Sequence, residues 1–179
     1  MMKVLAFAAT NSKASINKQL VSHAGQLLQA NTGAQVELLD LNDFEMPIYS
    51  VDREAEHGIP EPAQAFFDRI SAADALLISF AEFNGNYTSA YKNLFDWASR
   101  IDQKVYQNKP TVLLATSPGA GGAQSVLGIA AGSAPYFAME VKAQLSVPSF
   151  YDNFDQQAGE LNNDELAAQL KTALASLHG

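Results

Sequence analysis

The chain has 179 residues, of which 47% are hydrophobic and 17% charged. This predicts one globular domain, residues 1–179, with a substantial core. Its formal net charge of −8 argues against nucleic acid or an anionic membrane surface as a main partner. The absence of cysteine excludes thiol catalysis, disulfides, iron–sulfur clusters and zinc sites built on cysteine.

The first predicted element is a strand at Val4–Ala9, an apolar run typical of a strand buried on both faces of a parallel sheet. No signal peptide or membrane span precedes it, so we expect a cytoplasmic protein. Small polar residues follow at positions 10–15, and a helix should begin near Ser15. The apolar residues at helical spacing are Ile16, Leu20, Ala24, Leu27 and Leu28.

The loop at 10–15 has the ingredients of an anion site. N–H groups in the first turn of a helix lack partners, and the helix dipole adds partial positive charge there. Candidate groups are the side chains of Thr10, Ser12, Lys13, Ser15 and Asn17 and the first helical turn from Ile16. This stretch alone is equally compatible with an ordinary turn and a helix cap at Ser15. With neither GxGxxG nor GxxxxGK[ST] present, a monophosphate is the ligand that remains.

The next stretch combines a short strand with a long connection. Gln35–Leu39 alternates, which predicts a strand near the sheet edge. Residues 41–60 contain two prolines and a charged patch, and we expect an irregular surface excursion that covers part of the molecule. Pro62 suits the start of a helix.

Two further units repeat the order strand, loop, helix. Buried strands are predicted at 74–80 and 111–116, followed by the loops 81–87 and 117–122. A helix over about Thr88–Arg100 follows the first of these loops. A last strand is predicted at Val141–Val147 and a closing helix at Asn162–Leu177.

The alternation of strands and helices predicts an α/β fold. We expect a flavodoxin-like three-layer sandwich, a five-stranded parallel sheet in order 2-1-3-4-5 with helices on both faces. Ligands of such sheets bind beyond the carboxyl ends of the strands, at the switch between the first and third strands. The loops 10–15, 81–87 and 117–122 all reach this place, and their convergence indicates a ligand crevice more strongly than any one loop.

The three loops resemble those of the NAD(P)H-dependent FMN reductases, a flavodoxin-like family that includes quinone, azo-dye and chromate reductases. The family's first loop, GSxRxxSxNxxL, lies over ATNSKASINKQL (9–20), with Ser12 in the Arg position. Its second, PEYNGSxPxxLKNALDWxSR, lies over AEFNGNYTSAYKNLFDWASR (81–100), with Ala81 in place of Pro. Its third, SPG followed by glycines, lies over 117–122. The similarity covers roughly two-thirds of the chain.

The resemblance implies that FMN is the cofactor and that each loop binds a different part of it. The first would cradle the phosphate, with Lys13 either replacing the missing Arg or pointing to water. The second would present backbone groups of Glu82, Phe83 and Asn84 to the isoalloxazine edge, and Gly85 would allow close approach or a positive φ. The third would border the pyrimidine side of the ring. Its candidate residues are Ser117, Pro118, Gly119, Gly121 and Gly122.

Other residues of the second motif have structural interpretations. Trp97 belongs to the core or to a subunit interface, and Asp96 and Arg100 are spaced for an i,i+4 ion pair. Tyr87 either stacks over the flavin or is an exposed loop aromatic. The histidines show no ligand spacing, so neither a metal site nor a catalytic histidine is predicted.

A homodimer or homotetramer is expected. The helix at 88–100 carries more large apolar residues than one buried face uses. They are Tyr91, Leu94, Phe95, Trp97 and Ala98. The resemblance also implies subunit contacts near this helix.

The implied activity is transfer of electrons from NADH or NADPH, through FMN, to a small acceptor such as a quinone or free flavin. The flavin carries this chemistry, so no catalytic side chain is required. A single crevice predicts a ping-pong scheme.

Two alternatives to this activity stay open. One is a flavodoxin-type electron carrier, against which the KNxxDWxSR helix argues. The other is a degenerate module that has lost flavin, suggested by Ser12 and Ala81.

Overall fold

The computed structural model describes residues 1–178 and contains a five-stranded parallel sheet in order β2-β1-β3-β4-β5. The predicted flavodoxin-like order is therefore confirmed. The strands are β1 (Lys3–Ala8), β2 (Gln35–Leu39), β3 (Ala75–Phe80), β4 (Lys109–Thr116) and β5 (Met139–Val147).

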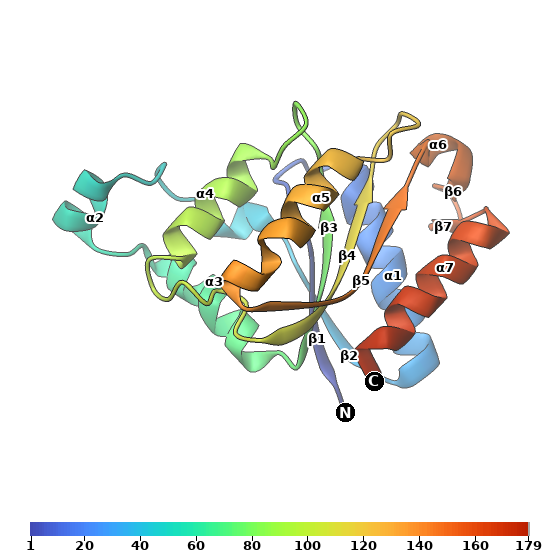
Figure 1. Ribbon diagram of the computed structural model, residues 1–179, viewed down its shortest axis with the longest axis horizontal. Helices are drawn as coiled ribbons and strands as arrows, with labels where there is room; N and C mark the ends of the chain where they lie inside the picture. The colour runs from blue at the N-terminus through green and yellow to red at the C-terminus, as the bar shows by residue number, and fades with distance from the viewer. Residues whose placement is uncertain (179) are drawn as a thin grey trace.

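Helices cover both faces of the sheet (Figure 1). One face carries α1 (Ile16–Thr32) and α7 (Asp164–Ala175). The other carries α3 (Glu61–Ala72), α4 (Ser89–Ala98) and α5 (Gln124–Ser133). The short elements are η1 (Leu41–Phe44), α2 (Val51–His57), η2 (Ala134–Phe137), α6 (Phe150–Asn153), β6 (Phe154–Asp155), β7 (Glu160–Leu161) and η3 (Ser176–His178).

The central strands are apolar on both sides because each face of the sheet has its own core. Leu77 of β3 packs in the core under α1 and α7, whereas Leu76 and Ile78 pack under α3, α4 and α5. All three side chains are 0% exposed. Burial of one such side chain contributes about 1.5–3 kcal/mol, so a one-residue slip of β3, which would move each side chain to the opposite face, is strongly disfavoured.

The helices begin where side chains satisfy their free N–H groups. The hydroxyl of Ser15 accepts from the backbone N–H groups of Asn17 and Lys18 at the start of α1. Thr88 caps α4 and Asn163 caps α7 in the same way. Each cap contributes about 0.5–2 kcal/mol.

The predicted excursion at 41–60 contains the short helices η1 and α2, so the expectation of irregular structure is wrong. It is tied to α4. The amide of Asn93 donates to the carbonyl oxygens of Met46 and Pro47 and accepts from the N–H of Tyr49 at 2.8 Å. The indole N–H of Trp97 donates to Pro47 O at 2.7 Å.

The predicted ion pair between Asp96 and Arg100 does not form. α4 ends at Ala98, so Arg100 lies past the helix and off its ladder of i,i+4 neighbours. Arg100 Nε instead donates to Glu54 Oε2 at 2.9 Å, and Asp96 pairs with Lys92 at 2.8 Å.

The large apolar residues of α4 are mostly buried within their own chain. Tyr91, Leu94 and Trp97 are 3%, 2% and 1% exposed, and Phe95 alone among the large ones is half-buried. The sequence argument for a free apolar face on this helix is therefore wrong, because the 41–60 segment and α5 flank the helix and cover it.

The antiparallel pair β6–β7 packs against α1 and was not predicted. Its strands are two residues long, too short for a periodic pattern to reveal. Leu161 N donates to Nε2 of His23 at 3.4 Å, and the ring of Phe154 meets His23 edge-on. Within residues 1–178 no helix is long and apolar enough to cross a bilayer.

Candidate functional site

The three loops leave neighbouring strands at one edge of the sheet. Loops 10–15, 81–87 and 117–122 follow β1, β3 and β4, which lie side by side. The N–H of Ala9 donates to Ser79 O at 2.8 Å, and the hydroxyl of Thr88 donates to Ala9 O at 2.9 Å. The exit of β1 is therefore bonded to both ends of the second loop.

Asn17 joins three elements from a buried position. Its amide nitrogen donates to Thr116 O at 3.1 Å, and its amide oxygen accepts from Thr116 N at 3.1 Å and from the hydroxyl of Ser79 at 2.8 Å. With 2% exposure, the side chain is used in positioning α1 against β3 and β4. The structure thus gives this side chain a positioning role, and its predicted contact with a phosphate stays a prediction.

Ser79, Thr116 and Thr88 are thus parts of the site's frame that the sequence reasoning missed. Each is 0–1% exposed. The available signal was a hydroxyl within an otherwise apolar run, since a buried polar group needs a partner. Ser79 and Thr116 lie in such runs.

The first loop keeps several groups free for an anion. Residues 11–14 are exposed, and the N–H of Ile16 has no acceptor within residues 1–178. Lys13 forms no ion pair with any described residue. The hydroxyls of Thr10 and Ser15 accept bonds from Ser12 N and from the first helical turn, so these two shape the loop.

Lys18, in the first turn of α1, uses its charge in an ion pair within the protein. Its ammonium donates to Asp40 Oδ2 at 2.5 Å. That hydrogen bond, with further ones from Asn42, lowers the pKa of Asp40 to about 2. Lys13 is therefore the cation of this region that is left for a ligand.

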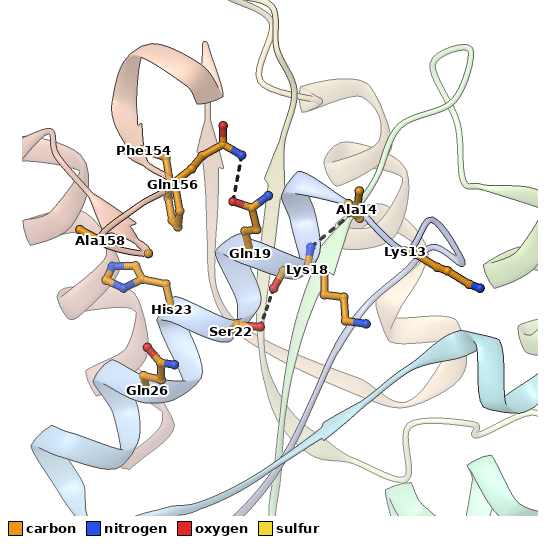
Figure 2. Close-up of a pocket in the computed structure, with 12 residues that line it drawn as sticks. Lys13, Ala14, Lys18, Gln19, Ser22, His23, Gln26, Phe154, Gln156 and Ala158 are labelled. Carbon is orange, nitrogen blue, oxygen red and sulfur yellow. Dashed lines mark hydrogen bonds between the residues drawn. The ribbon is translucent and has the colours of Figure 1, made fainter.

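A cavity of about 390 Å³ borders the first loop along the outer side of α1 (Figure 2). Figure 2 shows Lys13 extending away from His23 and Phe154, which line its opposite end. None of the lining residues belongs to the second or third loop. This cavity therefore shares only the first loop with the crevice that the three loops define.

The second loop is a tight turn whose tip offers backbone donors. Phe83 and Asn86 exchange two backbone hydrogen bonds, so the N–H of Phe83 is already used. Its carbonyl oxygen keeps a second lone pair, and the predicted contact of Phe83 with a ring stays a prediction. Asn84 and Gly85 form the tip with φ of 54° and 74°, which confirms the predicted positive φ of Gly85. Their N–H groups are exposed and lack acceptors within residues 1–178.

The side chains of the second loop point into the protein at its two ends. Glu82 Oε2 accepts from Val126 N of α5 at 2.8 Å. The ring of Tyr87 packs 5.0 Å from Tyr91, and burial raises the pKa of Tyr87. Tyr87 is half-buried in an aromatic cluster, so neither predicted role of this ring is supported.

The third loop combines open glycines with one tightly packed glycine. Gly119 and Gly121 are exposed, and a Cβ on either would meet nothing within 4 Å. Gly122 has φ of 58°, and a Cβ there would lie 2.3 Å from Ser146 Oγ. Gly122 is therefore required by the fold, whereas the other two glycines leave space outside it.

The segment after β5 supports the third loop. Ser146 Oγ donates to Gly122 O at 2.7 Å, Ser149 N to Gly119 O at 2.9 Å, and Phe150 N to Ser117 O at 3.0 Å. These bonds hold the loop from the side opposite to the second loop. Pro118 is exposed at its tip.

The residues present fit FMN. The unpaired N–H of Ile16 at a helix start and the lysine Lys13 suit a phosphate. Exposed N–H groups at the tip of the second loop and glycines with open space suit close approach of a flat ring. No group of three or more potential metal ligands lies within residues 1–178.

Comparison with known proteins gives the same assignment. Residues 2–152 match the sequence family described as NADPH-dependent FMN reductase. The NADPH:quinone oxidoreductase of Arabidopsis thaliana is 30% identical over 126 residues, 70% of this chain and 63% of that protein. The NAD(P)H-dependent FMN reductase of Pseudomonas aeruginosa is 33% identical over 118 residues, 66% of this chain and 61% of that protein.

A solved structure shares the fold over nearly the full length. The flavoenzyme NAD(P)H:(acceptor) oxidoreductase FerB from Paracoccus denitrificans superposes with a TM-score of 0.76 at 24% identity, covering 99% of this chain and 95% of that one. The matched stretch spans less than two-thirds of the two curated relatives. The family match over residues 2–152 covers all three loops of the crevice, and the chain belongs to the NADPH-dependent FMN reductase family.

Proposed function

We propose that this protein binds FMN in the three-loop crevice and transfers electrons from NADH or NADPH to a small acceptor. The observation that carries the proposal is the convergence of free N–H groups and open glycines on neighbouring strand ends. FMN, when bound, accepts a hydride equivalent from a nicotinamide and passes two electrons on.

The protein's own residues would bind FMN and orient its ring. Ile16 N–H, Ser12 and Lys13 would hold the phosphate, and the N–H groups of Asn84 and Gly85 would bond the ring edge. Asn17, Ser79 and Thr116 would fix the distance between the phosphate loop and the strand ends.

The visible spectrum of the purified protein is the first test. We expect flavin absorbance that is released as FMN, not FAD, on denaturation. Colourless protein that stays colourless with added FMN would support a module without flavin. Bound FMN that NAD(P)H fails to bleach without oxygen would support the electron-carrier alternative.

A ping-pong scheme belongs to the same proposal. Nicotinamide and acceptor would use the one exposed face of the flavin in turn. Double-reciprocal plots with NAD(P)H and a quinone should give parallel lines. Intersecting lines would mean a ternary complex and a second site.

We propose quinones as the acceptor class, and a cytoplasmic location. The Arabidopsis relative is named as a quinone oxidoreductase. Rates with 1,4-benzoquinone, free FMN and an azo dye should rank the quinone first. Cell fractionation tests the location.

We also propose a homodimer or homotetramer that forms through the α4–α5 face. A cavity of about 330 Å³ lies between these helices, and six aromatic side chains are among the residues that line it. Ile129 at its rim is 37% exposed and the nearby Tyr136 is 74% exposed. Light scattering at micromolar concentration should give a multiple of the monomer mass. The Ile129→Lys substitution should lower the measured mass towards that of the monomer. Ile48→Lys, at a residue that is 75% exposed elsewhere, is the matched control.

A further inference from the structure

The start of α5 lacks a cap of its own. Its N-cap residue is Ala123, in a left-handed conformation with φ of 57° and with no side-chain oxygen to offer. The N–H groups of the first turn of a helix need acceptors from outside it. Val126 is the third residue of α5, and its N–H donates to Glu82 Oε2 at 2.8 Å. A residue 44 positions earlier in the chain thus supplies the cap.

This bond joins the second loop to α5, the helix that follows the third loop. Glu82 opens the second loop directly after β3, and α5 follows the third loop directly. The other end of the second loop also reaches α5, where the hydroxyls of Tyr87 and Ser133 lie 3.4 Å apart, a weak contact. The carboxylate of Glu82 is the short, charged link between the two loops, and charged groups form the stronger hydrogen bonds.

The carboxylate also changes the charge at this edge of the crevice. A helix N-terminus carries partial positive charge, which favours an anion nearby. Glu82 places a full negative charge there. A flavin ring gains negative charge on reduction, and a neighbouring anion opposes that gain.

We propose that Glu82 is a positioning residue that locks the second loop to the third and, through its charge, lowers the reduction potential of FMN held between them. This inference rests on the proposed FMN binding. It assigns Glu82 a side-chain role in addition to the backbone contacts expected from the resemblance.

Two substitutions separate the link from the charge. Glu82→Gln keeps an oxygen that can accept from Val126 N but removes the charge. Glu82→Ala removes both the acceptor oxygen and the charge. The matched control is Glu165→Gln, which removes the same charge from the first turn of α7, a remote helix capped by Asn163.

The link is tested without cofactor, by hydrogen exchange in the apoprotein. Glu82→Ala should speed exchange of the Val126 amide roughly tenfold or more, as expected for loss of a charged hydrogen bond. Glu82→Gln should change it much less, and Glu165→Gln not at all. Unchanged exchange in Glu82→Ala would overturn the proposed link.

The charge effect is tested by redox titration of the FMN-loaded protein. Glu82→Gln should shift the midpoint potential to a more positive value, whereas Glu165→Gln should leave it at the wild-type value. Equal potentials in all three proteins would overturn the electrostatic role. Failure of the wild type to bind FMN would refute the proposed function, while the exchange experiment would still decide whether Glu82 links the loops.

Discussion

The side chain of Ser15 is compatible with two predicted roles, as a helix cap and as a phosphate ligand. As a helix cap its hydroxyl accepts from two N–H groups, and its hydrogen is still available as a donor. The geometry confirms the cap. The phosphate contact is a separate prediction, because the cap uses only the oxygen lone pairs.

Substitutions at Ser15 separate these roles. Replacing an N-cap Ser by Ala costs about 0.5–2 kcal/mol, but replacing it by Gly costs only a few tenths. We therefore expect Ser15→Ala to lower the unfolding free energy of the apoprotein clearly more than Ser15→Gly, measured by urea denaturation. If the hydroxyl also bonds the phosphate, both variants should weaken FMN binding to a similar degree. Wild-type affinity in Ser15→Gly would leave the cap as its whole role.

His23 predicts a pH dependence of stability. Burial lowers its pKa below the ordinary 6.5, an effect that the nearby Glu160 only partly offsets. The unfolded chain therefore takes up a proton before the folded protein does. Stability should be complete above about pH 6.5 and fall as the pH drops towards the lowered pKa.

The test compares urea denaturation at several pH values from 5 to 8. His23→Gln should flatten the decline below pH 6.5, because the titrating group is gone while an oxygen can still accept from Leu161 N. The exposed His57→Gln is the control. An equal slope in His23→Gln and wild type would show that other groups cause the decline.

At the scale of elements, the sequence predicted the core strands and their order well. The apolar runs VLAFAA and ALLISF predict buried strands, and their alternation with helices predicts a parallel sheet. The 41–60 segment was not predictable in the same way. Its structure depends on Asn93 and Trp97, whose contacts with Pro47 join residues far apart in sequence.

Contacts between residues far apart in sequence also limited the prediction of the site. Motif matching identified the loops but not which groups in them are free. Asn17 matches the family motif, yet its amide forms three hydrogen bonds within the protein, to Thr116 and Ser79. Long-range partners of this kind leave no periodic or spacing signal along the chain.

The third loop yields a prediction from two adjacent glycines. Gly121→Ala should leave the apoprotein as stable as wild type or up to about 1 kcal/mol more stable, since its site is open. Gly122→Ala should destabilise it by about 1–3 kcal/mol, because of its positive φ and contact with Ser146. Urea denaturation measures both.

FMN titration then separates the two variants further. A methyl group at position 121 should weaken FMN binding if the ring approaches this glycine. A stable Gly121→Ala variant with wild-type affinity would place the ring elsewhere in the crevice.

For the whole molecule, ligand binding should appear as added stability. A ligand that binds only the folded state at a hundred times its Kd adds about 2.7 kcal/mol. For a chain of 179 residues this corresponds to a rise in Tm of about 5–10 °C. FMN should produce such a rise in thermal denaturation. Riboflavin, which lacks the phosphate, should produce a smaller one at equal concentration, and an equal rise would contradict a phosphate site in the first loop.

The support of the third loop has a consequence for how the protein is made. Ser146, Ser149 and Phe150 hold that loop, and they lie at and beyond the end of β5, the last strand of the main sheet in the chain. Domains form as the chain leaves the ribosome, from the N-terminus onward. The first and second loops emerge long before residue 150. A nascent chain that ends after β4 therefore carries two loops of the crevice and an unsupported third, and it becomes able to hold cofactor only when β5 and the residues behind it have been synthesised.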